Sequence, residues 1–292
     1  MKTHGTFRYK LLTGVAACAL LLAVEGTPAR AEPAQNWWLT FQGQVPIWEE
    51  NSDNNFGNGL SLGEGFGIGG EFGWKIDDIH SIITRVKINK RSNSQSQSSL
   101  FYNSPSSYGG SSDSQAGENT TFVADLEIGR DVGLGALGMG DGDLRVFAGV
   151  RVGHLTASSE SEFSSYSGFG SSDSTRRTFT GAGPRIGFSA SKPLSESVAF
   201  DLGVAGGVLI GRQKETFESN YSGFSSNSDS DSRTAVVPNV EASAAMKFLF
   251  NEDTTFSAGY KVDAYFDAIG DFGNGKSDRI IHGPFVQFTI KN

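Results

Sequence analysis

Apolar and polar residues alternate with period two along most of this chain, and this alternation limits the fold more than any other feature. In one segment, Val198, Phe200 and Leu202 fall on one side and Asp201 falls on the other. Successive side chains of a β-strand face opposite sides of the sheet, so such a segment is typical of a strand with one apolar face. About ten segments show the pattern, which predicts an all-β fold. They span residues 37–47, 66–75, 82–91, 122–131, 144–152, 182–190, 198–210, 236–248, 256–264 and 286–290.

The connections between these segments alternate between long and short. Long loops on one rim and short turns on the other, with an even number of strands, are typical of bacterial outer-membrane barrels. We therefore predict a single antiparallel transmembrane β-barrel of about ten strands with long Ser/Gly/Asn-rich outer loops. The predicted long loops are 49–62, 92–118, 158–177, 213–233 and 268–277, and the short turns are 77–80, 132–143, 192–197 and 251–253.

A soluble β-sandwich is the alternative to a barrel. In a sandwich the face away from the core meets water and accepts charges freely. Here the charged residues avoid one face of every segment except near its ends, as at Lys90, Arg130 and Arg212. A Lys or Arg on the lipid face at mid-depth costs about 2–4 kcal/mol, so this avoidance favours a barrel in lipid.

The N-terminus has the layout of a secretory signal peptide. A cationic start precedes an apolar run at 11–24, which is too short to span a bilayer, and an A-x-A site ends at Ala31. We predict a signal peptide at 1–31 and an outer-membrane barrel at 32–292. A lipoprotein signal at Cys18 is the alternative, although the apolar run continues past it. The net charge of −8 argues against a general nucleic-acid binder.

Charged residues on the face opposite the apolar one are predicted to line the barrel interior, and several of them fall opposite one another. The register places Asp125 opposite Arg151, Asp131 opposite Arg145, Glu71 opposite Arg85 or Lys87, and Glu241 close to Lys261. Such pairs either form an internal polar core or line an ion pathway, and a slight excess of cations would favour anions. The predicted pore-lining residues are Glu71, Lys75, Arg85, Lys87, Asp125, Glu127, Arg145, Arg151, Arg185, Asp201, Glu241, Lys261 and Asp263.

Three of the long loops share a Ser-rich pattern that contains Tyr, Gly and Phe. Drift of low-complexity sequence is one explanation, and a shared surface patch with aromatic contacts is the other. Expected partners are outer-membrane lipid and lipopolysaccharide, the outer-membrane assembly machinery and a host or matrix ligand. The residues of the predicted surface-loop binding patch are Tyr108, Tyr166, Phe169, Tyr221 and Phe224.

Signals for catalysis are poor, and we predict that the protein is not an enzyme and has no cofactor and no metal site. No G-x-S-x-G, H-E-x-x-H or Cys/His metal spacing occurs. An omptin-type protease would need a histidine beside an acidic residue at the outer rim. The nearest candidates are His154 and His282 with Asp263 or Asp278, but strand parity separates His282 from Asp263.

Three Gly-rich segments resemble the Legionella-type major outer membrane protein family. The resemblance covers roughly the second half of the mature chain, and it implies a pore-forming barrel exposed at the cell surface. No cysteine follows Cys18, so intersubunit disulfides proposed for some family members cannot form. The C-terminal residue is Asn292 rather than an aromatic, which displaces the usual assembly signal inward. The segments are residues 181–188 (GAGPRIGF), 202–213 (LGVAGGVLIGRQ) and 282–286 (HGPFV).

Two functions follow from these features. The first is a narrow pore for passive passage of ions or small solutes, although barrels of about eight strands are filled by side chains and open channels come with about sixteen. The alternative is a non-conducting surface protein for adhesion, envelope integrity or partner binding through the loops.

Overall fold

A computed structural model describes residues 37–52, 65–104, 107–138, 140–165, 170–222, 226–269 and 277–292. The predicted signal peptide and the lipoprotein alternative at Cys18 lie outside these residues. The strands are β1 (Trp37–Gln44), β2 (Ile47–Ser52), β3 (Gly65–Lys75), β4 (His80–Ser104), β5 (Ser107–Asp131), β6 (Asp143–Ser165), β7 (Gly170–Pro193), β8 (Val198–Tyr221), β9 (Asn227–Leu249), β10 (Thr254–Tyr265) and β11 (Ser277–Lys291).

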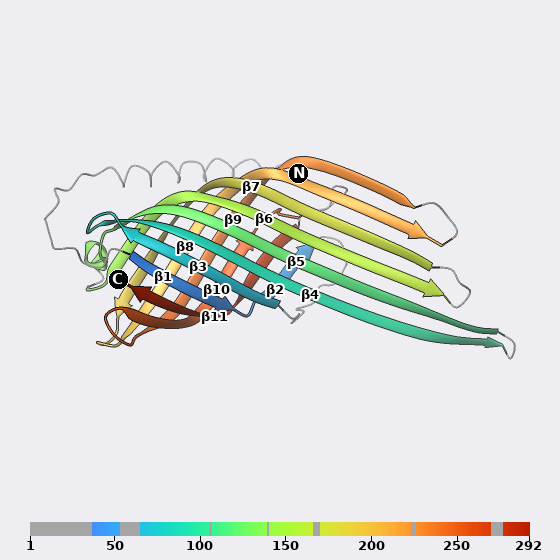
Figure 1. Ribbon diagram of the computed structural model, residues 1–292, viewed down its shortest axis with the longest axis horizontal. Coiled ribbons are helices and arrows are strands. Elements are labelled where there is room, and N and C mark those ends of the chain that lie inside the picture. The colour runs from blue at the N-terminus through green and yellow to red at the C-terminus, as the bar shows by residue number, and fades with distance from the viewer. Residues whose placement is uncertain are drawn as a thin grey trace.

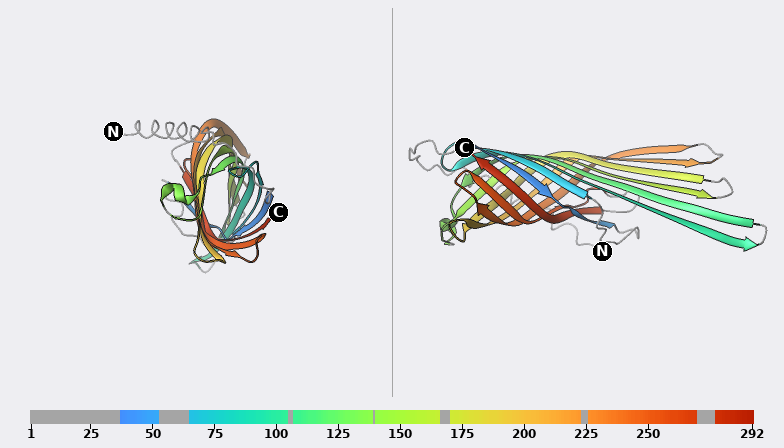
Figure 2. Two further views of the ribbon diagram at one scale, coloured as in Figure 1. Left: turned by 90° about the vertical axis from the view of Figure 1, so that its left-hand side faces the viewer. Right: turned by 60° about the horizontal axis from the view of Figure 1, so that its bottom comes forward.

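The strands close into a ring of 10 antiparallel strands, as the alternation predicts. β1 pairs with β3 on one side and with β11 on the other, and this second pairing closes the sheet on itself. β2 continues along β11 where β1 stops, so β1 and β2 together occupy one place in the ring. The interruption falls at Pro46, which has no N–H to donate to a ladder. The end-on view in Figure 2 shows the closed ring.

Both described ends of the chain meet at one end of the barrel. The backbones of Trp37 and Asn292 exchange two hydrogen bonds of 3.2 and 2.9 Å. The short turns before β4, β6, β8 and β10 lie at this same end, which we call the turn end. The turn before β6 includes a 3-10 helix at Leu134–Leu137. None of the helices within the described residues is both long and apolar enough to cross a membrane.

Strand lengths differ greatly around the ring. β4 to β9 each contain 23 to 25 residues, whereas β1, β3, β10 and β11 contain 8, 11, 12 and 15. The long strands therefore project far beyond the barrel on one side, as Figures 1 and 2 show. We call this projection the wall, and it comprises residues 92–104, 107–118, 157–165, 170–177, 213–221 and 227–235.

The prediction of loops at 92–118, 158–177 and 213–233 is wrong, because most of these residues form paired strands in the wall. The register of β6 with β7 and of β8 with β9 continues without a shift from the barrel into the wall. Each new pair extends an existing ladder, so it needs no new core, and polar side chains suit both faces because neither face packs against a second sheet or lipid chains.

Side chains of the barrel alternate between an apolar outward face and a packed interior. Val86, Leu126 and Val150 are about half exposed on the outside, whereas Arg151 and Arg185 are buried inside. This is the opposite of a soluble protein, in which water-facing positions are polar.

Candidate functional site

The centre of the barrel interior is organised around one buried carboxylate, Glu127 of β5. Arg85 donates to Glu127 Oε1 at 2.7 Å, and Arg185 donates to the same oxygen at 2.9 Å. Arg145 reaches Oε2 at 3.5 Å. The three guanidinium groups also lie 5.2 to 5.7 Å from the centre of the Phe147 ring, within cation–π range. Positive charge thus surrounds one carboxylate and one ring.

A second group of contacts surrounds Arg151 of β6. Its Nε and Nη2 donate to the two oxygens of Asp125 at 2.7 Å each, in a bidentate pair. Nη2 also donates to Glu241 at 2.8 Å, and Nη1 donates to Asn239 at 3.1 Å. Since Glu241 and Asn239 lie on β9, this arginine connects strands that are not neighbours in the sheet.

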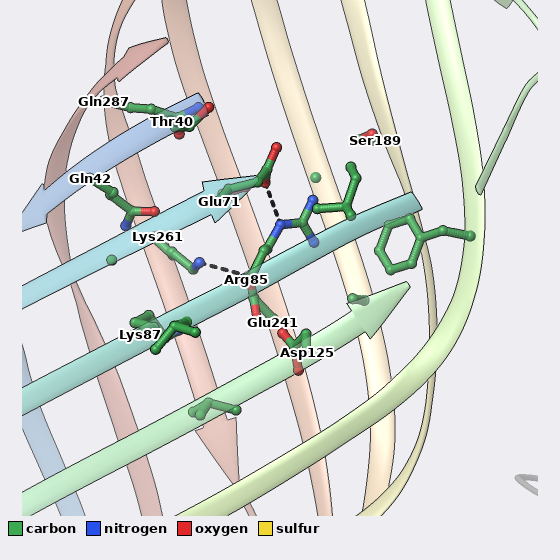
Figure 3. Close-up of a pocket in the computed structure, with 18 of the residues that line it drawn as sticks. Thr40, Gln42, Glu71, Arg85, Lys87, Asp125, Ser189, Glu241, Lys261 and Gln287 are labelled. Atoms are coloured by element: carbon green, nitrogen blue, oxygen red, sulfur yellow. Dashed lines mark hydrogen bonds and ion pairs between the residues drawn. The ribbon is translucent and has the colours of Figure 1, made fainter. Parts of the chain in front are cut away.

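Two lysines complete the network on the side of β10. Lys87 of β4 contacts Asp263 of β10 at 2.5 Å, so this ion pair crosses the lumen. Lys261 contacts Glu241 at 2.7 Å. Figure 3 shows Lys87, Lys261 and Glu241 close together, with a dashed line that joins Glu71 to Arg85. Mutually bonded charges therefore line the interior at this level.

The predicted register agrees with these contacts. Asp125 is opposite Arg151 and Glu71 is opposite Arg85, and both pairs form ion pairs. Asp131 is also opposite Arg145, but the Arg145 side chain turns to Ser81 and Glu127 instead. Near the turn end Asp201 pairs with Lys247, and Lys75 is exposed. The predicted interior residues that lie in the central network are Glu71, Arg85, Lys87, Asp125, Glu127, Arg145, Arg151, Arg185, Glu241, Lys261 and Asp263.

A layer of buried apolar side chains lies between this network and the wall, and sequence reasoning missed it. Leu155, Phe179, Leu209 and Val237 occupy inward positions and are fully buried, although most other inward positions on these strands are polar. The signal was present, because each is an apolar residue in the otherwise polar inward register. We call the set the apolar layer, and its members are Trp48, Val123, Leu155, Phe179, Leu209, Val237, Tyr265, Ala268, Ile269 and Ile281.

Arg279 of β11 packs on the wall side of this layer. Its guanidinium lies 5.4 Å from the Trp48 ring centre. It also donates to Asn119 at 2.9 Å and to the carbonyls of Thr120 and Thr156, both at 3.2 Å. One buried side chain therefore links β11 to β5 and β6 across the mouth of the barrel.

A cavity of about 320 Å³ remains in the barrel on the network side of the layer. Its lining includes Thr40, Gln42, Glu71, Ser189 and Gln287, which Figure 3 labels. The lining mixes hydroxyl, amide and charged groups with apolar side chains such as Ile83, Phe147 and Phe285, so the cavity can hold water or a small solute with polar groups.

The inner face of the wall carries aromatic side chains on a polar background. Phe163, Phe217 and Tyr221 are 44, 39 and 53% exposed, and all three have the parity of the inward residues on their strands. Asp173 lies directly opposite Ser219 among them. The Oδ1 of Asp173 and the Oγ of the buried Ser219 have no hydrogen-bond partner among the described residues. This face thus exposes aromatic rings, and the two polar atoms between them are shielded from solvent.

Only part of the predicted aromatic loop patch lies within the described residues. Tyr221 is the last residue of β8 and is exposed. Tyr108 lies in β5, opposite Tyr102 of β4 near the hairpin end. Tyr166, Phe169 and Phe224 lie outside the described residues. Phe163 and Phe217 were missed, because the segments that contain them were taken as loops, in which parity has no meaning.

The histidines do not form a catalytic arrangement within the described residues. His154 bonds Thr180 at 2.7 Å on the outward face, and His282 bonds the Tyr260 hydroxyl there. Asp263 faces inward, as parity predicts. Across the described ranges no three His, Cys, Asp or Glu side chains are placed to hold a metal ion.

His80 belongs to the turn before β4. Its ring lies 2.9 Å from the Asp77 carboxylate, which also accepts the backbone N–H of Ile79 at 2.9 Å. The hydrogen bond with the His80 side chain, followed by that from Ile79, lowers the pKa of the Asp77 carboxyl below its ordinary value of 3.8. His80 therefore has a local structural role in this turn.

Comparison with protein families gives a match over residues 61–291 to the Legionella pneumophila major outer membrane protein precursor family. The chain belongs to this family. The match covers most of the predicted mature chain, whereas the Gly-rich segments that resemble the family lie in its second half. Membership places the protein in the bacterial outer membrane, with the turn end toward the periplasm and the wall outside the cell by the usual arrangement of such barrels.

Solved structures with a related architecture are distant in sequence. The outer membrane protease OmpT from Escherichia coli is 11% identical, with a TM-score of 0.47, over 88% of this chain and 94% of that one. The translocator domain of the autotransporter NalP from Neisseria meningitidis is 10% identical, with a TM-score of 0.30, over 98% and 96%. The CymD monoaromatic hydrocarbon channel is 8% identical, with a TM-score of 0.26, over 88% and 89%. A search of curated proteins finds no match.

Proposed function

We propose that this outer-membrane barrel is a non-conducting surface protein that binds a basic segment of a host or matrix protein on the inner face of its wall. The single observation that carries the proposal is the wall itself, since six long strands present their inner face outside the cell. A pore needs only the barrel and gains nothing from such a projection.

Charge complementarity points to a basic partner. The tip of the wall, residues 92–104, 107–117, 159–165, 170–175, 216–222 and 226–232, contains no Lys or Arg. Asp173, Asp229 and Asp231 share the inner face with Phe163, Phe217 and Tyr221. Carboxylates beside exposed rings suit the ammonium and guanidinium groups of Lys and Arg, through ion pairs and cation–π contacts. The carboxylates of the tip are Asp113, Glu160, Glu162, Asp173, Glu218, Asp229 and Asp231.

Opposite faces of the wall supply a matched control for this proposal. Asp173→Asn, Asp229→Asn and Asp231→Asn remove three charges from the inner face, whereas Glu160→Gln, Glu162→Gln and Glu218→Gln remove three from the outer face. Attachment of bacteria to a surface coated with a Lys/Arg-rich peptide should fall at least severalfold with the first set and stay near the wild-type level with the second. Equal losses in both sets, or none, would reject the inner face as the binding surface.

A narrow pore for ions or small solutes is the second candidate. The cavity of about 320 Å³ and the charged residues among its lining favour this function. Against it stand the apolar layer and the cross-lumen ion pairs. We expect folded wild-type protein to give no conductance steps in planar bilayers, and steady steps would make the pore the leading function.

We also propose that the protein is not an enzyme. Within the described residues His154 bonds the Thr180 hydroxyl and His282 bonds the Tyr260 hydroxyl, and neither of these contacts supplies a carboxylate that would activate water. Incubation of the refolded protein with lipopolysaccharide and with a dibasic peptide should yield no cleavage products by mass spectrometry. Turnover that disappears in His154→Ala or His282→Ala would instead assign an omptin-like activity.

A further inference from the structure

The apolar outward band of the barrel ends on β6 to β9 at a single row of paired residues. Val152 is opposite Ala182, Ala182 is opposite Ile210, and Ile210 is opposite Val236. Outward residues toward the turn end of this row are mainly apolar and meet lipid chains. Outward residues beyond the row therefore lie at the depth of lipid headgroups.

The next three outward positions on each of these four strands are all hydrogen-bond donors. They comprise three cations, one histidine and otherwise only Ser and Thr, with no apolar residue and no carboxylate. We call this surface the donor patch. Its residues are His154, Thr156 and Ser158 on β6, Arg176, Thr178 and Thr180 on β7, Arg212, Lys214 and Thr216 on β8, and Ser230, Ser232 and Thr234 on β9.

Hydrogen bonds within the patch fix some of its side chains, and the charged side chains remain exposed. The His154 ring is held between Thr180 and Thr156, at 2.7 and 3.2 Å. Arg212 donates to Ser232 at 2.7 Å and remains exposed. A guanidinium that keeps only a neutral hydroxyl as its described partner has donors left for an anion.

Arg176 and Lys214 complete the cationic group. Lys214 lies one outward position beyond Arg212 on β8, and Arg176 is diagonal to Lys214 across the pair Thr216–Arg176. Both side chains are exposed. Diagonal neighbours on one face of a sheet lie about 7–8 Å apart, so one anionic headgroup can reach both.

None of the twelve patch positions is a carboxylate, although the chain as a whole has a net charge of −8. The nearest outward carboxylates border the patch: Glu160 and Glu218 lie one row farther out, diagonal to Arg176, and Glu118 of β5 is opposite Ser158. At a similar height on β4 and β5, Lys90 is already paired with Glu118 at 2.9 Å. Arg212 and Lys214, by contrast, lie three and two outward positions from Glu218 on β8, so these two cations are farther from carboxylates than Arg176 and Lys90 are.

We infer that the donor patch binds the phosphate groups of lipopolysaccharide in the outer leaflet. Phosphate oxygens are acceptors only, and Arg, Lys and hydroxyl donors match them. The apolar row directly below would hold the acyl chains of the same molecule, so the surface is amphipathic in the way that a phosphorylated lipid requires. This assignment depends on the outer-membrane location of the family and not on whether the lumen conducts or the wall binds a protein.

The test compares two triple variants of the full-length folded protein in detergent. Arg176→Gln, Arg212→Gln and Lys214→Gln empty the patch of charge. Lys90→Gln, Arg130→Gln and Lys192→Gln remove the same number of cations from outward positions elsewhere. Heat-modifiable migration on a gel verifies that each variant is folded before its affinity for short-chain lipopolysaccharide is measured.

A basic residue near an anionic lipid surface contributes about a fivefold factor in affinity, so the patch variant should bind about 100-fold more weakly. The control variant should keep wild-type affinity, and phosphatase-treated lipopolysaccharide should bind the wild type as weakly as native lipopolysaccharide binds the patch variant. Unchanged binding by the patch variant, or an equal loss in the control, would overturn the inference. Inorganic phosphate that competes as well as the lipid would overturn the assignment to lipid.

Discussion

At the scale of single residues, Glu127 connects three arginines from three different strands inside the barrel. The alternation places it on the inward face, so its burial follows from the sequence. Its partners do not follow, because Arg85 and Arg145 lie on the strands beside it whereas Arg185 lies two strands away. The curvature of the closed sheet brings these side chains together. The alternation along a single strand shows which residues face inward but does not show how the sheet curves.

We predict that Glu127→Gln lowers the free energy of unfolding by about 3–5 kcal/mol, since the buried Arg145 and Arg185 and the partly exposed Arg85 lose their shared carboxylate. Glu118→Gln, which breaks the exposed pair with Lys90, should change it by less than about 1 kcal/mol. Urea titration in lipid vesicles, followed by the heat-modifiable band, measures both. A loss as small as that of the control would show that the arginines find other partners.

Asp77 gives a residue-scale prediction for pH. Its pKa in the folded turn is below the ordinary value of 3.8, so its contribution to the turn is complete above that pH and disappears as pH falls through the lowered pKa. In a carbon-13 titration of the folded protein, the Asp77 carboxyl should titrate below 3.8, and His80→Ala should move its midpoint upward. A midpoint at or above the ordinary value in the wild type would contradict the hydrogen bonds of this turn.

At the scale of elements, the sequence predicts the barrel half of each strand and misses the wall half. Residues 198–210 have one apolar face, so period two is visible there. Residues 92–99 and 109–117 consist almost entirely of polar residues and glycine, so no alternation remains to be detected there. Their Ser, Asn and Gly content also suggests loops. The register propagated from the barrel, rather than local propensity, makes them strands.

The wall should add little to the stability of the barrel for the same reason. We predict that replacing residues 96–114 by an Asn-Gly turn, which joins the opposed Gln95 and Gln115, changes the free energy of unfolding by less than about 1 kcal/mol. Leu155→Ala, in the apolar layer, should cost about 2–5 kcal/mol in the same assay. Failure of the shortened hairpin to fold would mean that the β4–β5 tip takes part in assembly.

At the scale of the whole molecule, the barrel has three levels with different chemistry. Bonded charges line a cavity in the middle, the apolar layer lies across the mouth, and the wall projects beyond it. The sequence predicts the first level, because charged inward positions are common to most strands. The second depends on single residues from different strands, such as Leu155, Phe179 and Ile281, which meet only when the sheet closes.

The apolar layer leads to the last prediction, which concerns water in the lumen. Leu155 lies opposite Phe179 and Leu209 lies opposite Val237, and all four are fully buried. A narrow apolar constriction blocks ions because water leaves it, so polar side chains there should admit water and ions. Leu155→Asn with Leu209→Asn should therefore produce conductance steps in planar bilayers, whereas Arg151→Gln, which leaves the layer intact, should not. Conductance in Arg151→Gln alone would assign the block to the ion-pair network, and silence in both variants would mean that each level is sufficient to close the lumen.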